Sequence, residues 1–355
     1  MSFPELQPEL LYVIVFGPGF GESIVIRPPE STDVGWVFVD SCQDRGTVPA
    51  ASLLRDQGGR RACAILTHPH QDHGMGFDEI ISTPGDGFVG CTNPMVSRPE
   101  NVSQSSDWDV SADDVAQLHS GRLGATIRAI HARWEDDPST RWELRRGNQK
   151  NIGPLQLNVL HPDEKATRKD PTNFNELSSP ITIHWEDLVL LLGADLPGSI
   201  WAKLPEQSPR LFQHALLKVP HHGSKNDISS RYASGVGRNR FWIITPYNRG
   251  SKKLPDFEPG GGMDALLDHV EKAHLTALPL PKTTARGAHS DATLDELRQA
   301  PPSGPIPSVG GVSTQPLQTE LPDDDYRCFV GAGFGADGTL EHPLFGPGSL
   351  TITKE

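Results

Sequence analysis

The stretch that decides both the fold and the chemistry of this chain is Thr67-His68-Pro69-His70-Gln71-Asp72-His73-Gly74. It follows a short apolar run at 62–66, which we expect to be a buried strand. His68 and His70 are two residues apart, so an extended loop can direct both imidazoles toward one ion. Asp72 and His73 follow on the next turn and can face a second ion. Imidazole nitrogen and carboxylate oxygen suit zinc, manganese or iron, so the sequence predicts a metal-binding loop.

Chance and a plain surface loop are the competing explanations for this cluster. Three histidines and an aspartate in this frame arise by chance in about one chain in a thousand. We therefore favour metal binding over a histidine-rich surface loop.

Other acidic and histidine residues also stand where apolar runs end. Asp40 follows the run at 36–39, Asp195 follows the run at 188–192, and the pair His221-His222 follows the run at 215–219. Sites are commonly built at the strand ends of layered sheets, so we expect these residues to lie near the metal-binding loop. A carboxylate after so apolar a run needs a partner, because a buried unpaired charge is unfavourable. Two metal ions bridged by Asp195 would supply that partner.

Each of these positions also has a plainer interpretation. Asp195 could be an exposed turn residue, and Asp40 is as readily a turn residue as a carboxylate that orients a ligand histidine. One histidine of the His221-His222 pair could complete the second ion's ligands while the other contacts substrate, and the sequence does not decide which. His161 stands at another strand end before a proline, where a capping role is favoured over ligation.

Composition excludes several classes of function. The chain has 355 residues and a formal net charge of -13. Such an acidic balance argues against a general DNA coat and against a polybasic membrane-surface protein. Its four cysteines are dispersed and form no CxxC pair, which argues against a cysteine zinc site or a disulfide framework. No signal peptide and no apolar run near ~20 residues is visible, so we expect a cytoplasmic protein without a membrane partner.

The order of the apolar runs indicates how the chain is organised. The runs at 11–16, 23–27 and 35–40 predict an antiparallel meander, and strands resume at 155. We interpret the polar stretch at about 95–150 as an insertion that covers one side of the site. Helices are expected at 50–58, 76–81, 112–134 and 263–273. The predicted parts are a catalytic core at 1–285, a Pro/Ser/Gly-rich loop or linker at 286–325, and a C-terminal β-hairpin at 326–355 that packs back on the core.

Taken together, these motifs resemble those of a known protein superfamily. The cluster is similar to the HxHxDH signature of the metallo-β-lactamase superfamily, and Asp195 and His221 stand where its later ligands would. Within it, the chain most resembles the C-terminal hydrolase domain of the bacterial competence DNA-channel protein (ComEC-like). The resemblance covers about residues 10–250 and rests on three pieces: Gly17 to Asp40; Leu160-His161-Pro162 with Asn175, Ser178 and the run to Asp195; and Lys218-Val219-Pro220-His221-His222-Gly223-Ser224-Lys225.

The resemblance implies a fold and a ligand set. The fold would be an α/β one, an αββα sandwich of two mixed β-sheets flanked by helices, here with an insertion and an extended C-terminal segment. The cofactors would be two divalent metal ions, Zn²⁺ first and Mn²⁺ as the other candidate. One ion would be held by His68, His70 and Asp195, and the other by Asp72, His73, Asp195 and His221. The separate middle histidine ligand tends to be missing in that subgroup, which argues against His161 as a ligand.

The main functional hypothesis is a phosphodiesterase or nuclease that uses a metal-bridging hydroxide. Asp72 or Asp195 would accept a proton, and His222 would be the histidine that acts on the substrate. The predicted substrate contacts are Asn175, Ser224, Lys225 and Arg249. The metals and a cation such as Lys225 or Arg249 would stabilise the developing charge. The expected partner is a phosphodiester substrate, with nucleic acid among the candidates.

Two other functions remain open. The same metals could hydrolyse a carboxylic ester, lactone, amide or thioester of a small molecule, because the fold alone does not determine which bond is hydrolysed. A metal-stabilised subunit could instead bind a protein partner through the insertion at 95–150. The membrane channel of the competence protein has no counterpart here, so DNA uptake is not the expected role.

Overall fold

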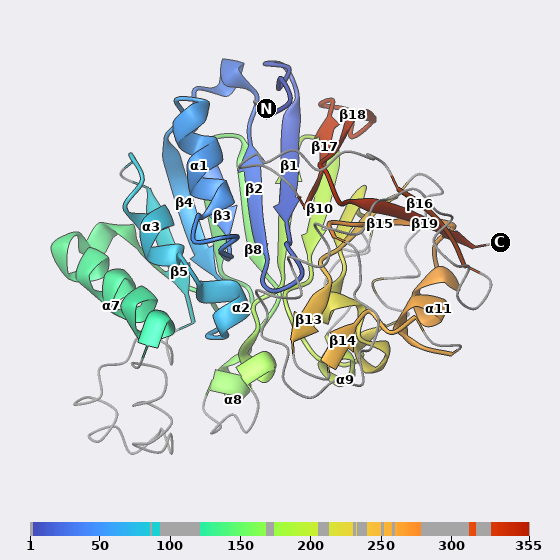
Figure 1. The fold of residues 1–355 in the computed structure, drawn as a ribbon. Helices are drawn as coiled ribbons and strands as arrows, with labels where there is room; N and C mark the ends of the chain where they lie inside the picture. The colour runs from blue at the N-terminus through green and yellow to red at the C-terminus, as the bar shows by residue number, and fades with distance from the viewer. Residues whose placement is uncertain are drawn as a thin grey trace.

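Two large β-sheets lie face to face in this chain, and helices cover their outer sides (Figure 1). The computed structural model describes residues 3–85, 87–92, 121–167, 174–204, 213–229, 232, 240–249, 252–257, 260–277, 312–316 and 328–354. Within these ranges, one sheet has eight strands, the other has nine, and a separate two-stranded hairpin stands beside them.

The first sheet has the strand order β18-β17-β1-β2-β3-β4-β5-β6. Its first three strands along the chain are antiparallel, which confirms the predicted meander. From β3 to β6 the strands are parallel. The bounds are β1 Leu11–Phe16, β2 Ser23–Arg27, β3 Trp36–Val39, β4 Arg61–Leu66, β5 Phe88–Cys91, β6 Arg141–Glu143, β17 Phe329–Phe334 and β18 Leu340–Phe345.

The second sheet has the order β16-β19-β15-β12-β11-β10-β9-β8-β7. Its central strands β10, β11, β12 and β15 run parallel. The bounds are β7 Gln149–Ile152, β8 Leu155–Val159, β9 Ile181–Trp185, β10 Leu188–Leu192, β11 Leu216–Lys218, β12 Phe241–Ile244, β15 Lys272–Leu275, β16 Val312–Pro316 and β19 Leu350–Lys354, with the hairpin formed by β13 Tyr247–Arg249 and β14 Lys252–Leu254.

The described helices are short apart from α7. They are α1 Pro49–Asp56, α2 Gln71–Gly74, α3 Phe77–Ile81, α7 Gly121–Asp136, α8 Glu164–Thr167, α9 Gly198–Trp201 and α11 Gly262–Leu267. Helices α1, α3 and α7 cover the outer face of the first sheet, while α9 and α11 lie on the side of the second (Figure 1).

Alternation along single strands explains why four layers form. In β1, Leu11, Val13 and Val15 belong to the core between the sheets, whereas Tyr12 and Ile14 belong to the core under the helices. Successive side chains point to opposite faces of a strand, so a strand buried on both faces reads as a continuous apolar run. Strand β10 behaves alike and is buried throughout. The predicted αββα sandwich is therefore confirmed.

Several boundaries differ from those the sequence predicts. The helix expected at 263–273 ends at Leu267, and 272–275 form β15, because pairing with β12 and β19 buries Ala273 and Leu275 in the sheet. Much of the expected insertion belongs to the sandwich, since α7, β6 and β7 all come from 121–152. The rest of it, 95–120, lies outside the described residues, and this part includes 112–120 of the predicted helix.

The C-terminal segment also differs from a simple hairpin. It supplies β17 and β18 to the first sheet and β19 to the second. Of the predicted linker, 312–316 form the edge strand β16, and the remainder lies outside the described residues. Among the residues that the structure describes, no helix is long and apolar enough to cross a membrane.

The core between the sheets gives a stability prediction. Leu190 is fully buried there, whereas Leu340 on β18 is 41% exposed. Leu190→Ala should lower the free energy of unfolding by about 2–5 kcal/mol, because it removes apolar contacts and leaves a cavity. The matched control Leu340→Ala should change it by less than about 0.5 kcal/mol. Urea unfolding measures both, and equal losses would contradict this account of the core.

Candidate metal centre

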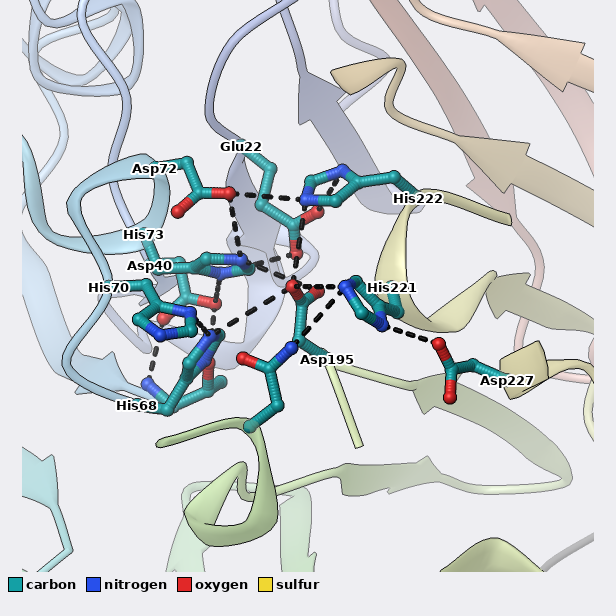
Figure 2. A network of polar contacts seen from close by, with 12 residues as sticks. Glu22, Asp40, His68, His70, Asp72, His73, Asp195, His221, His222 and Asp227 are labelled. Atoms are coloured by element: carbon teal, nitrogen blue, oxygen red, sulfur yellow. Dashed lines mark hydrogen bonds and ion pairs between the residues drawn. The ribbon is translucent and has the colours of Figure 1, made fainter. Parts of the chain in front are cut away.

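The predicted chemical residues meet where strands of both sheets end (Figure 2). Asp40 follows β3 and the His68–His73 loop follows β4, its parallel neighbour in the first sheet. Asp195 follows β10, and the His221-His222 pair follows β11, its parallel neighbour in the second sheet. Parallel neighbours end at the same edge of a sheet, so packing two such edges together gathers the four segments.

One group of possible metal ligands consists of His68, His70 and Asp195, whose ligand atoms all lie within 4.8 Å of one another. His68 Nε2 lies 3.1 Å from His70 Nδ1 and 4.0 Å from Asp195 Oδ2. Burial and the neighbouring histidines lower the pKa of His68 well below its ordinary value. The neutral imidazole is the form that binds a metal ion.

A second group lies on the other side of Asp195. His73 Nε2 is 3.4 Å from Asp195 Oδ1, and His222 Nε2 is 3.7 Å from Asp195 Oδ2. His222 Nε2 is also 3.3 Å from Asp72 Oδ2. Asp195 therefore stands between both groups, as Figure 2 shows.

The two histidines of the pair have different surroundings. His222 is buried beside Asp72, and its Nδ1 donates to the Thr245 carbonyl at 2.8 Å. His221 lies at the rim, where its Nδ1 donates to Asp227 Oδ2 at 2.5 Å and its Nε2 is 3.3 Å from Asn175 Nδ2. Its Nε2 is 3.9 Å from Asp195 Oδ2. The geometry thus brings His222, rather than His221, into contact with the ligand loop.

The backbone is strained at the two histidines that point to different partners. His221 and His222 have φ values of 45° and 55°, in the left-handed region that non-glycine residues seldom adopt. Each such residue costs about 1–3 kcal/mol and persists where the surroundings hold it, often at functional sites. The turn aims the two neighbouring imidazoles at different partners.

Asp40 holds the ligand loop from behind. Its carboxylate accepts hydrogen bonds from the Thr67 amide and hydroxyl, both at 2.7 Å, and from His73 Nδ1 at 2.8 Å. Fixing one ring nitrogen of a histidine orients the other, which here points toward Asp195.

The charge of the cluster fits divalent cations. With the histidines neutral, the buried carboxylates of Glu22, Asp40, Asp72, Asp195 and Asp227 are offset by one buried lysine, Lys218, in this part of the described structure. The four negative charges that remain are what two divalent ions would balance. Although burial opposes it, the carboxylates of Asp195, Asp40 and Glu22 raise the pKa of His73 well above its ordinary value, so the same field favours a cation.

Two buried polar atoms without a hydrogen-bond partner in the described structure lie where an ion fits. His73 Nε2 and Asp195 Oδ1 are buried and have no hydrogen-bond partner among the described residues. They face each other at 3.4 Å. Buried polar atoms are rarely left without a partner, and imidazole nitrogen with carboxylate oxygen is a metal donor set.

The other residues predicted for the site differ in their burial and in their contacts. Asn175, in the short helix η3 (Phe174–Leu177), is buried beside His221. Ser224 is half-buried and donates its backbone N–H to the His221 carbonyl, and Lys225 is exposed next to it. His161 Nε2 contacts the Glu176 carbonyl at 2.8 Å and belongs to neither ligand group. The side chain of Arg249 lies outside the described residues.

Sequence reasoning missed four residues of the site: Glu22, Lys218, Thr245 and Asp227. A signal was available for two of them. Lys218 stands inside an apolar run and Glu22 stands directly before another, and charged residues buried in this way need partners. Asp227 and Thr245 had no such signal, because polar residues after a strand are common.

No protein-family profile matches the chain, and no curated protein matches it. Among solved structures, a metallo-β-lactamase from Cronobacter sakazakii is 14% identical, and the match covers 60% of this chain and 77% of that one with a TM-score of 0.35. A subclass B3 metallo-β-lactamase from a soil metagenome is 12% identical, with coverages of 62% and 78% and a TM-score of 0.34.

CmlA, a diiron β-hydroxylase from Streptomyces venezuelae, is 14% identical with a TM-score of 0.33. That match covers 61% of this chain but only 35% of CmlA, so the chain spans about a third of that protein's length. Similarity at these values assigns no function, and the chain's own residues have to supply the interpretation.

The contrast between the paired histidines gives a second prediction. His222→Ala should reduce the bound divalent metal from two ions per chain to one, because His222 faces Asp72 and Asp195. His221→Ala is the matched control and should retain both ions. Elemental analysis after dialysis against zinc measures the ratio. Loss of an ion in His221→Ala but not in His222→Ala would contradict the geometry.

Proposed function

We propose that this chain is a dinuclear metal-dependent phosphodiesterase of the metallo-β-lactamase superfamily. The observation that supports it best is the position of Asp195, a buried carboxylate shared by two groups of histidines. A single carboxylate placed in this way can bridge two ions.

The ligand sets follow from the contacts. His68, His70 and Asp195 would hold one ion, and Asp72, His73, Asp195 and His222 would hold the other. We assign His222 to the second ion in place of His221, because His222 Nε2 lies 3.3 Å from Asp72 Oδ2. Two divalent ions sharing a carboxylate supply a water molecule of lowered pKa and neutralise the attacking and leaving oxygens of an in-line displacement at phosphorus, as in phosphatases and nucleases.

His221 is the residue best placed to handle the substrate's leaving group. Its imidazole is held by Asp227, whose carboxylate also accepts from the Gly198 amide at 3.1 Å. Despite burial, these hydrogen bonds lower the pKa of Asp227, so the carboxylate is ionised and orients the ring. With Nδ1 donating to Asp227, Nε2 faces Asn175 and the metal centre, where it can hold or pass a proton.

We propose that the substrate approaches from the His221 side. His221 has 15% of its side chain exposed, whereas His68, His73 and His222 are almost fully enclosed. Asn175 lies beside His221, and the exposed Lys225 comes four residues after His221 in the chain. We propose that Asn175 and Lys225 contact the phosphate. We favour a short phosphodiester over long duplex nucleic acid, because a net charge of -13 repels a polyanion away from the metals.

Hydrolysis of bis(p-nitrophenyl) phosphate by the zinc- or manganese-loaded chain tests this function. We expect cleavage in the wild type and its loss in the double variant His70→Ala with Asp195→Ala, which removes ligands from both sites. Chromogenic carboxylic esters and a β-lactam serve as comparison substrates. Undiminished phosphodiester cleavage in the double variant, or cleavage of the esters alone, would contradict the proposal.

The role of His221 gives a separate prediction. Asp227→Asn should lower kcat by about 10–100-fold, because the imidazole loses the partner that orients it. The variant should still bind two ions, because Asp227 belongs to neither ligand group. Steady-state kinetics and elemental analysis on the same preparation check both statements. Loss of metal without a change in kcat per bound metal would show that Asp227 does not act through His221.

A further inference from the structure

A buried ion pair stands beside the metal centre and joins the two sheets. Glu22 comes directly before β2 of the first sheet, and Lys218 is the last residue of β11 in the second. Both side chains are fully buried, and the Lys218 ammonium contacts the Glu22 carboxylate. A buried ion pair is weak evidence for stability, because desolvation offsets the attraction. Its position therefore has to be explained in another way.

The contacts of Glu22 give that explanation. Its Oε2 accepts a hydrogen bond from Thr245 Oγ1 at 2.7 Å. Its carboxylate oxygens lie 3.7 Å from His73 Nδ1 and 3.9 Å from His222 Nδ1. The same two imidazoles point their Nε2 atoms at Asp195 and Asp72. Glu22 thus lies beside both histidines proposed for the second ion, as Figure 2 shows.

Glu22 is close enough to be counted among possible ligands, in a group with His73, Asp195 and His222. Its surroundings favour a different role. Lys218 and Thr245 occupy its Oε2, and the Nδ1 atoms that it faces already donate to Asp40 and to the Thr245 carbonyl. Glu22 is therefore nearest the Nδ1 atoms of both histidines, and their Nε2 atoms are the ones near Asp195.

The backbone of Glu22 holds the ligand loop as well. Its N–H donates to the Asp72 carbonyl at 2.9 Å. The preceding Gly21 has a φ of 89°, and an added Cβ would lie 2.9 Å from that carbonyl oxygen and 2.8 Å from Cys42 Cβ. Only glycine allows the glycine-rich turn to pack this closely on the loop. One residue thus contacts the ligand loop by its backbone and the second sheet by its side chain.

We propose that Glu22, neutralised by Lys218, is a positioning residue for the second metal ion. It fixes the distance between the ligand loop of the first sheet and His222 of the second. This inference rests on the proposed dinuclear centre. Partners behind metal-bound histidines commonly set metal affinity in this way.

The test separates positioning from stability. Glu22→Gln and Lys218→Met each leave a buried charge without its partner, so each should lower the melting temperature. The double variant E22Q/K218M removes both charges and should melt close to the wild type. We expect it to bind the second ion about 10–100-fold more weakly than the wild type. Competition with a chromophoric chelator measures the affinity, and the visible spectrum of the cobalt-loaded chain reports the second ion's ligand geometry.

The control is Arg27→Gln, which removes a buried charge at the opposite end of β2, where Arg27 pairs with Glu30. It should retain both ions with wild-type affinity. Glu22→Asp keeps the charge and is the second variant if the double variant does not fold, with an expected affinity below the wild type and an altered cobalt spectrum.

The outcomes are distinguishable. Wild-type affinity and an unchanged cobalt spectrum in E22Q/K218M, or in Glu22→Asp, would overturn the positioning role and leave the metal centre intact. Fewer than two ions in the wild type would overturn the metal centre, and this inference with it.

Discussion

The burial of one negative charge, the carboxylate of Asp195, is the constraint around which the candidate metal centre is built. It follows the fully buried strand β10 and is 2% exposed. A carboxylate in such a place is unfavourable unless cations or hydrogen-bond donors surround it. Histidines from both sheets do so: His68 and His73 come from the loop after β4, and His222 comes from the segment after β11. The face-to-face packing of the two sheets is what brings these donors together.

The histidines proposed as ligands each have a hydrogen-bond partner outside the metal centre. His73 Nδ1 donates to Asp40, and His222 Nδ1 donates to the Thr245 carbonyl. The Thr67 hydroxyl, which donates to Asp40, lies 3.0 Å from His68 Nδ1 and can accept from it. Each ring therefore has one nitrogen committed to the protein and the other turned toward the centre. Such preorganisation lowers the free energy needed to bind ions in a fixed geometry.

Much of the fold could be predicted from the sequence because the strands are locally encoded. Apolar runs such as Leu188 to Leu192 identify strands that are buried on both faces. A sheet made of such strands needs another layer of structure packed against each of its two faces. Prediction was less successful where pairing partners are distant. The apolar residues at 263–273 fit a helix, yet Ala273 enters a strand because β12 and β19 offer it an edge on each side. Local periodicity contains no information about those edges.

The candidate ligand loop from His68 to His73, and the aspartate and histidines that follow later strands, could be identified from sequence alone, because these residues follow local apolar runs. Only the tertiary structure decided which histidine of the pair meets Asp72, since two left-handed residues turn neighbouring side chains toward different partners. It also decided the pairing of Glu22 with Lys218, which lie on strands of different sheets. The physical reason is that burial makes a charge require a partner, while the packing of the sheets determines which partner is within reach.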